Sequence, residues 1–384
     1  MKLRACSSAL VTAALTLGLT AVASPAGAAD PAGAAGQRPF LDRLNTVSFV
    51  ASTVPENGDQ NPYGTFTIRE SIGDLHRGNV LVSNFNNSVP LQGLGTTLVQ
   101  ISPNGTRTTF ATIDPNNLPG PCPGGVGLTT ALTVLPGGWV VVGSLPTTDG
   151  MPDTAQAGCL LVLDKHGTVR ETIEGGGING PWDMTAVSTE KRGGGSGQTE
   201  LFVTNVLNGT VAGGGAEVDE GTVLRITLCT EGDQPPQRVA TTVIGSGFPE
   251  RTDPAALVVG PTGVGLGHDG TLFVADTVLS RITAIPHALT RDDSAGIGRV
   301  ITSGGSLNGP LGMAITPKGD ILTVNGGDGN IVETTERGQQ VATKQINNEG
   351  NPPGAGALFG LDLDLDRDAV YFVNNTDNAL DVLH

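Results

Sequence analysis

Residues 260–276 read GPTGVGLGHDGTLFVAD and contain two short strands with a turn between them. Residues 263–266 and 272–275 are largely apolar, as strands are, and His-Asp-Gly at 268–270 has the composition of a tight turn. The second strand ends at an acidic residue, Asp276. The segment predicts an antiparallel hairpin, and the rest of the chain repeats it.

An apolar strand that ends in a small polar residue recurs six times along the chain. We call these terminal residues the anchors: Asn84, Ser144, Asn205, Asp276, Asn325 and Asn374. A strand precedes each anchor strand and opens at a small or turn-forming residue, which is Gly64, Ala131, Asp183, Gly263, Gly312 or Gly360. The unit repeats about every 50 residues and includes two further strands, which is typical of a β-propeller blade.

The last repeat is one strand short, because residues 379–383 form its third strand and the sequence ends at His384. An apolar segment at residues 47–51 precedes the first repeat and has no partner there. We therefore predict an all-β fold over residues 46–384, a six-bladed β-propeller whose last blade is closed by the N-terminal strand. Two β-sandwiches would have the same density of strands but would not explain six aligned anchors.

The composition agrees with a strand-rich, loop-rich fold. Of the 384 residues, 57 are Gly and 25 are Pro, and charged residues make up 15%, so long helices are not expected. The formal net charge is −16. This acidity argues against nucleic acids and anionic membranes as partners, since both require clustered Lys and Arg.

The first residues have the pattern of a secretory signal peptide. Lys2 and Arg4 precede an apolar run at residues 9–23, and small residues follow up to Ala29. The run is shorter than the roughly 20 residues that span a bilayer, so we expect no membrane span. We expect residues 1–29 to be removed, residues 30–45 to form a linker, and the protein to be a secreted monomer.

Three cysteines would remain after this cleavage, in a compartment where disulfides persist. Cys122 lies in the connection into the second repeat, and Cys159 starts the third strand of that repeat, on the same face. We predict a disulfide between them. Cys229 ends a third strand, so we expect it at the opposite rim and unpaired.

The quoted segment, with Ser280, Arg281 and Ile282 after it, resembles an NHL repeat: Gly-Pro-x-Gly, a glycine turn, a strand ending in Ala-Asp, then an Arg-Ile strand. Residues 309–325 match well and the other repeats loosely. The resemblance implies a six-bladed propeller of the kind shared with the senescence-marker/gluconolactonase (SMP-30) and strictosidine synthase-like groups. It does not by itself imply a function.

Lactonase-type propellers of these groups hold a divalent ion on the axis through Glu, Asn and Asp at the start of the inner strands. The corresponding positions here are Tyr63, Thr130, Trp182, Thr262, Leu311 and Phe359, none of which is an anionic ligand. Asp183 and Asp362, near the inner strands, are the remaining metal candidates. No cofactor is predicted, although a divalent metal such as calcium is compatible with these two carboxylates.

Two functions stay open. The first is a secreted binding or scaffold module for a small molecule, glycan or protein, with the six anchors as candidate ligand contacts. Long connections at 86–95, 145–158 and 206–221 would place its site beside the first three repeats. The alternative reading of the anchors is structural, since Asn and Asp cap tight turns. The second function is that of a hydrolase or lyase that uses Asp183 and Asp362. It would resemble a lactonase or an esterase and could act with or without a metal ion.

Overall fold

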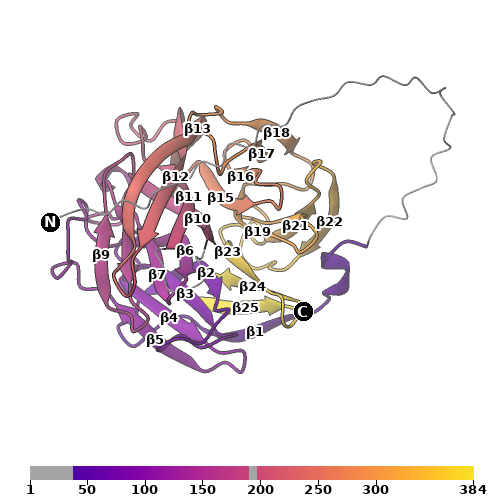
Figure 1. Cartoon of the computed structure of the whole chain (residues 1–384). Helices are drawn as coiled ribbons and strands as arrows, with labels where there is room; N and C mark the ends of the chain where they lie inside the picture. Colours follow the sequence, from indigo (N-terminus) through magenta and orange to yellow (C-terminus); the bar gives the residue numbers. More distant parts are fainter. Residues whose placement is uncertain (1–37, 190–196) are drawn as a thin grey trace, which may run out of the picture.

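The computed structural model describes residues 38–189 and 197–384, so the expected signal peptide lies outside the described residues. The described residues form six antiparallel sheets, and Figure 1 shows them arranged as blades around a central axis. The prediction of an all-β, six-bladed propeller is therefore confirmed. In the described part of the chain the only helical elements are two short 3-10 turns, η1 (Leu41–Arg43) and η2 (Pro152–Thr154), and no helix there is long and apolar enough to cross a membrane.

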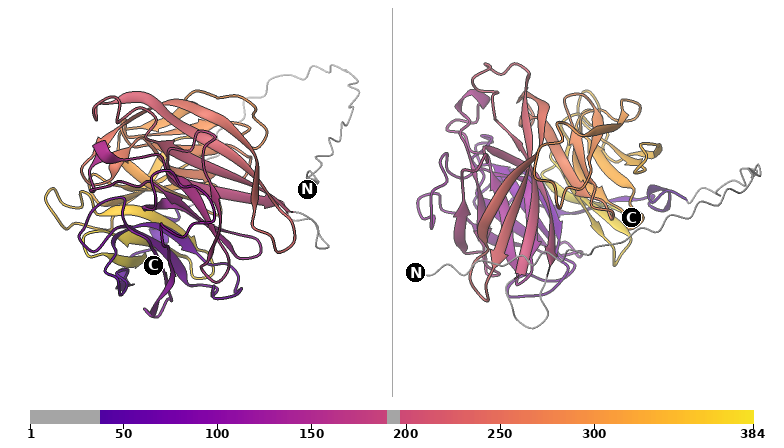
Figure 2. Two further views of the ribbon diagram at one scale, coloured as in Figure 1. Left: turned by 90° about the vertical axis from the view of Figure 1, so that its left-hand side faces the viewer. Right: turned by 45° about the horizontal axis from the view of Figure 1, so that its top comes forward.

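Each blade consists of consecutive strands that run outward from the axis. Blade 1 contains β2 (Gln60–Thr67), β3 (Val80–Asn86), β4 (Thr97–Ile101) and β5 (Arg107–Thr112), and blade 2 contains β6 (Leu128–Leu135), β7 (Trp139–Ser144), β8 (Cys159–Leu163) and β9 (Val169–Ile173). Blade 3 contains β10 (Gly180–Thr189), β11 (Gly197–Val206), β12 (Val218–Thr230) and β13 (Gln237–Asp253), with the short β14 (Leu257–Val259) added to β13. The strands of blade 3 are the longest, as the right-hand view of Figure 2 shows.

The other three blades are more regular. Blade 4 contains β15 (Pro261–Leu266), β16 (Leu272–Asp276), β17 (Arg281–Ile285) and β18 (Arg299–Ser303), and blade 5 contains β19 (Pro310–Ile315), β20 (Ile321–Asn325), β21 (Asn330–Thr334) and β22 (Gln340–Gln345). Blade 6 contains β23 (Leu358–Asp364), β24 (Ala369–Asn374), β25 (Ala379–Leu383) and β1 (Val47–Ser52). We call the end of the ring where the inner strands begin the anchor end, and the opposite end the hairpin end.

The ring closes where the two ends of the propeller meet. β1 pairs antiparallel with β25, with Val47 opposite Leu383 and Phe49 opposite Asp381, and Figure 1 shows the two strands side by side. The predicted closure of the last blade by an N-terminal strand is therefore correct. The pairing joins residues far apart in the sequence. It gives blade 6 its fourth strand, so β25 has a hydrogen-bonded neighbour on both sides.

Residues 40–44, part of the expected linker, pack against the propeller. Phe40, Leu41 and Leu44 are buried in one cluster with side chains of blades 5 and 6. The Glu333 carboxylate accepts hydrogen bonds from the N–H groups of Phe40 (2.7 Å) and Leu41 (2.8 Å). These residues therefore belong to the folded body together with β1.

Glycine at the start of the inner strands lets neighbouring blades approach closely. A Cβ added to Gly360 in blade 6 would lie 2.2 Å from the Tyr63 carbonyl oxygen in blade 1, and one added to Gly263 would lie 2.1 Å from the Leu311 carbonyl oxygen. Side chains do not approach backbone atoms so closely. The small residues that mark the repeats are therefore required by blade packing, and in blade 3 the equivalent position is occupied by Asp183.

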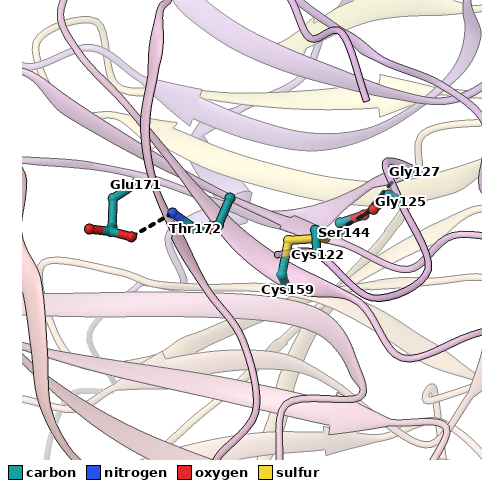
Figure 3. The surroundings of a disulfide bond; sticks show 7 residues. All are labelled: Cys122, Gly125, Gly127, Ser144, Cys159, Glu171 and Thr172. Carbon is teal, nitrogen blue, oxygen red and sulfur yellow. Dashed lines mark hydrogen bonds between the residues drawn. A yellow bond between two sulfur atoms is a disulfide. The ribbon is translucent and has the colours of Figure 1, made fainter. Parts of the chain in front are cut away.

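The predicted disulfide in blade 2 is present. Cys122 and Cys159 are bonded, with a Cα–Cα distance of 5.3 Å (Figure 3). Beside it, Ser144 Oγ donates to the Gly125 carbonyl (2.9 Å) and accepts the Gly127 N–H (3.0 Å). The disulfide and this serine together fix the connection into blade 2 at the anchor end.

The prediction that Cys229 is unpaired is wrong. No cysteine in the described ranges is free, and Cys229 is disulfide-bonded as well. The prediction came from counting three cysteines after removal of residues 1–29, a count that leaves one without a partner. Cys229 lies at the end of β12, as expected for the end of a third strand.

Candidate functional site

The central channel is closed at its anchor end by apolar side chains. Tyr63 stacks on Phe85 (ring centroids 4.5 Å apart) and on Phe359 (4.2 Å), and Trp182 lies 6.3 Å from Tyr63. All four rings are at most 3% exposed. These aromatic residues include three of the positions at which lactonase-type propellers would hold a metal ion, so here that part of the axis is a hydrophobic core.

Strand β14 and the turn before it cover these aromatic side chains. Tyr63 Oη donates to the Ala255 carbonyl (3.2 Å), and Trp182 Nε1 donates to the Val258 carbonyl (3.1 Å). Leu257, Val258 and Val259 are buried in the same cluster. We call this segment, residues 253–259, the plug. The two hydrogen bonds give the buried Tyr63 hydroxyl and Trp182 N–H a partner each. They also hold the plug against the aromatic side chains on the axis.

The other end of the channel contains a cavity of about 360 Å³. All six inner strands contribute to its wall, from residues near their C-terminal ends. Apolar side chains such as Leu132, Met184, Leu266 and Ile315 line it together with polar residues, and polar atoms make up the larger part of its exposed surface. Its size is that of a small-molecule site, and such sites contain a few convergent polar groups.

Asp183 supplies one of these polar groups. Its Oδ1 accepts the Met184 N–H (2.8 Å), and its Oδ2 accepts the Val264 N–H from blade 4 (3.3 Å). Burial raises the pKa of Asp183 to about 8, and the charge of Asp362 adds to the increase. Asp183 is therefore a neutral acid at pH 7 and can donate its proton in a hydrogen bond.

Asp362 supplies the second group, from blade 6, which lies opposite blade 3 in the ring. Its Oδ1 accepts the Leu363 N–H (2.8 Å), and its Oδ2 accepts the Thr67 N–H from blade 1 (2.6 Å). Burial raises the pKa of Asp362, while Arg69, whose Nη2 lies 3.7 Å from Oδ1, opposes the increase. The two aspartates thus use the same arrangement: each bonds the next N–H of its own strand and an N–H of the following blade.

Neither carboxyl group is arranged to hold a divalent cation. Each of the four oxygens accepts a backbone N–H, which occupies one of its two lone pairs. A hard cation such as calcium needs six or more oxygen ligands, and no group of three or more acidic, His or Cys side chains suited to a metal occurs within residues 38–189 and 197–384. The channel residues therefore do not fit the metal that the resemblance to lactonases implies.

The six anchors lie at the anchor end, as expected, and bind the chain itself. All are at most 5% exposed. Asn205 Nδ2, for example, donates to the Gly177 carbonyl (3.0 Å) and to Thr222 Oγ1 (3.0 Å), and Asp276 forms an ion pair with Arg281 (2.6 Å). None of the six lines the channel cavity. The contacts are those of turn-stabilising residues, and a ligand-binding role for the anchors remains a prediction.

The long connection after the anchor of blade 2 packs on the connection of blade 1. Thr147, in the connection of blade 2, is bonded to blade 1: its N–H donates to the Gly93 carbonyl (3.1 Å), and its Oγ1 donates to the Gln92 carbonyl (2.5 Å). The cavity at this end, about 300 Å³, lies between the plug and blades 4 to 6. The connections of blades 1 and 2 are thus in contact through Thr147, and a ligand site beside the first three repeats remains a prediction.

Arg69 and the plug were not identified from the sequence. Arg69 follows β2 with no motif around it, and its place beside Asp362 depends on the packing of blade 1 against blade 6. The plug lies in the connection between blades 3 and 4, outside the repeat. No signal in the sequence marks either feature.

No family model matches the sequence, and no curated protein sequence matches it. Among solved structures, a protein assigned as a gluconolactonase is similar, with 13% identity, a TM-score of 0.51, and coverage of 90% of this chain and 96% of that chain. A Thermus thermophilus protein assigned as an oxidoreductase (glucose dehydrogenase) has 14% identity, a TM-score of 0.52, and coverage of 88% of this chain and 99% of that chain. Identities of this size show the fold alone: the chain has the six-bladed β-propeller architecture of these proteins.

Proposed function

We propose that the protein is a secreted propeller that binds a small organic molecule with both polar and apolar groups in the channel cavity, between Asp183 and Asp362. The observation that carries the proposal is the channel cavity itself, whose lining contains two largely buried carboxyl groups, Asp183 and Asp362, on opposite sides of the ring. A buried titratable group with a perturbed pKa in such a cavity is a common mark of a functional site.

The two aspartates define the polar groups of the ligand. Neutral Asp183 has one O–H to donate, whereas Asp362, beside Arg69, is the better acceptor. A ligand with a carbonyl or ether oxygen at one end and a hydroxyl or amine hydrogen at the other would satisfy both. A ligand without them would leave buried polar groups unpaired, which costs affinity.

A screen of neutral hydroxylated and amide-bearing compounds, followed by calorimetry, should find binders that depend on both aspartates. Asp183→Asn replaces the carboxyl group by an amide of similar size, whose donor and acceptor have a different geometry. Asp362→Asn replaces the better acceptor by an amide. Each substitution should therefore weaken ligand binding about tenfold or more. Asp59→Asn is the matched control, since Asp59 is also buried but bonds Thr96 and Thr97 outside the channel. Binders whose affinity is the same in both channel variants as in the wild type would contradict the proposal.

A second candidate function is a metal-independent hydrolase or lyase. It is favoured by two largely buried carboxyl groups in one cavity: Asp183, whose pKa is raised by burial to about 8, and Asp362, whose pKa is raised by burial against the opposing charge of Arg69. General acid–base catalysis uses such a pair when the environment separates the two protonation states.

If the protein is such an enzyme, its rate should show a bell-shaped pH dependence. Activity requires Asp183 protonated, so it should fall as the pH rises through about 8, and it requires Asp362 ionised, so it should fall below the raised pKa of that group. The measurement is kcat/KM against pH on a panel of esters and lactones. Asp183→Asn should abolish the falling limb together with most of the activity, and unchanged turnover in a doubly substituted Asp183→Ala, Asp362→Ala protein would exclude this function for the pair.

A further inference from the structure

Arg69 brings a positive charge to the channel cavity. Among the described residues that line this cavity, it is the only Lys, Arg or His. It follows β2, the innermost strand of blade 1, at the hairpin end, and 59% of its side chain is exposed. Its guanidinium lies 6.0 Å from the centre of the Phe66 ring, which lines the same cavity. A cation is attracted to an aromatic face, so Phe66 helps to hold the charge at the cavity.

The N–H groups of this guanidinium have no hydrogen-bond acceptor within the described residues. Nη2 lies 3.7 Å from Asp362 Oδ1, which is close enough for an ion pair but too long for a hydrogen bond. Both oxygens of Asp362 accept a backbone N–H instead, from Leu363 and from Thr67. The planar set of donors on Arg69 is therefore free to bind another group.

Arg77 gives the contrast. It also reaches from blade 1 to an acid of blade 6, and 61% of its side chain is exposed. Its Nε (3.1 Å) and Nη2 (2.7 Å) both donate to Asp366 Oδ2, so its donors are used within the protein. Arg77 does not line the cavity. The arginine without hydrogen bonds is thus the one at the cavity.

A planar guanidinium with free N–H groups suits a carboxylate, which it binds through two parallel hydrogen bonds. Asp362, 3.7 Å from Arg69, accepts a ligand hydroxyl in the function proposed above, so the two ligand groups would be neighbours. We propose that the ligand of the channel cavity is a small hydroxy carboxylate, whose carboxylate is bound by Arg69 and whose hydroxyl donates to Asp362. This inference rests on the proposed binding of a small molecule in this cavity.

The charges of the cavity are compatible with an anionic ligand. Asp183 is neutral at pH 7, because burial raises its pKa to about 8. The charge of Asp362 is opposed by that of Arg69. The cavity therefore has little net negative charge to repel a carboxylate, and Arg69 determines whether an acid or a neutral compound is preferred.

Calorimetric titration of the full chain with small hydroxy carboxylic acids, each compared with its primary amide, tests this assignment. The amide has a similar shape but no charge. We expect the wild type to bind an acid at least about tenfold more tightly than its amide, because hydrogen bonds between charged partners are the stronger ones. Arg69→Gln should lose this preference and bind the amide nearly as before. Arg69→Lys keeps the charge but loses the planar fork, so it should retain only part of the preference.

Arg77→Gln is the matched control, because it makes the same change of charge between the same two blades, outside the cavity. It should keep the preference for the acid. The Arg69 side chain is largely exposed, so Arg69→Gln should melt near the wild-type temperature, and a lost preference would not come from unfolding.

Equal affinity of the wild type for acids and amides, or an unchanged preference in Arg69→Gln, would overturn the inference. If such ligands still depended on Asp183 and Asp362, the proposed function of the cavity would stand. The absence of binding by every acid and amide would also overturn the inference, and the screen of neutral compounds would then decide the proposed function separately.

Discussion

A chain that begins at Thr53 should fail to fold cooperatively, whereas a chain that begins at Arg38 should fold and melt in a single transition. The longer truncation removes β1, which is the fourth strand of blade 6, and with it the backbone partner of β25. It also removes Phe40, Leu41 and Leu44 from the core. At about 1.5–3 kcal/mol for each buried side chain, this loss alone approaches the total stability of a typical domain, about 5–15 kcal/mol.

Thermal unfolding followed by circular dichroism, with size-exclusion chromatography to detect aggregation, measures this effect. The exposed edge of β25 should make the shorter protein aggregate, because an unpaired strand edge pairs readily with other chains. The truncation at Arg38 is the matched control, since it leaves every contact of Phe40–Leu44 and β1 intact. A chain starting at Thr53 that is monomeric and melts within a few degrees of the control would show that ring closure contributes little.

Gly360→Ala should destabilise the propeller by about 3 kcal/mol. The new methyl group would lie 2.2 Å from the Tyr63 carbonyl oxygen, and this atom belongs to an inner strand that cannot move without disturbing blade 1. The same change at Gly312 would place the methyl group 2.2 Å from the Phe359 carbonyl oxygen. Both substitutions should therefore have similar effects on the free energy of unfolding, measured with urea.

Gly197→Ala is the control for these substitutions. Gly197 also lies in a strand, β11, but the nearest atom to an added Cβ is the Thr189 carbonyl oxygen at 3.9 Å. It should change the free energy of unfolding by no more than about 0.5 kcal/mol. Equal stability of Gly360→Ala and Gly197→Ala would mean that the blades can separate at little cost, contrary to the close approach of their inner strands.

The fold could be predicted because its evidence is local and repeated. Each repeat carries its own hairpin turn and anchor residue, and Gly263 or Gly360 marks the start of an inner strand in its own repeat. The disulfide between Cys122 and Cys159 followed from the same framework, since both residues fall at one end of blade 2. Closure by β1 was predicted from a missing strand at one end of the chain and an extra one at the other.

The site could be predicted only in part, because its properties arise between blades. Asp183 and Asp362 were identified from their places near inner strands, both as metal candidates and as candidate residues of a hydrolase or lyase. Their backbone partners, Val264 and Thr67, come from neighbouring blades, and the neutral state of Asp183 depends on burial that no local pattern shows. The plug lies in an insertion between repeats, so the repeat contains no information about it.

The plug also determines how molecules can move through the ring. Its hydrogen bonds to Tyr63 and Trp182 hold it across the anchor end of the channel. A molecule in the channel cavity would meet the four aromatic rings and the plug on the way to that end, so it would exchange with solvent from the hairpin end. The lifetime of a complex would then depend on that end of the ring, where Ser188 of the long strand β10 lines the cavity.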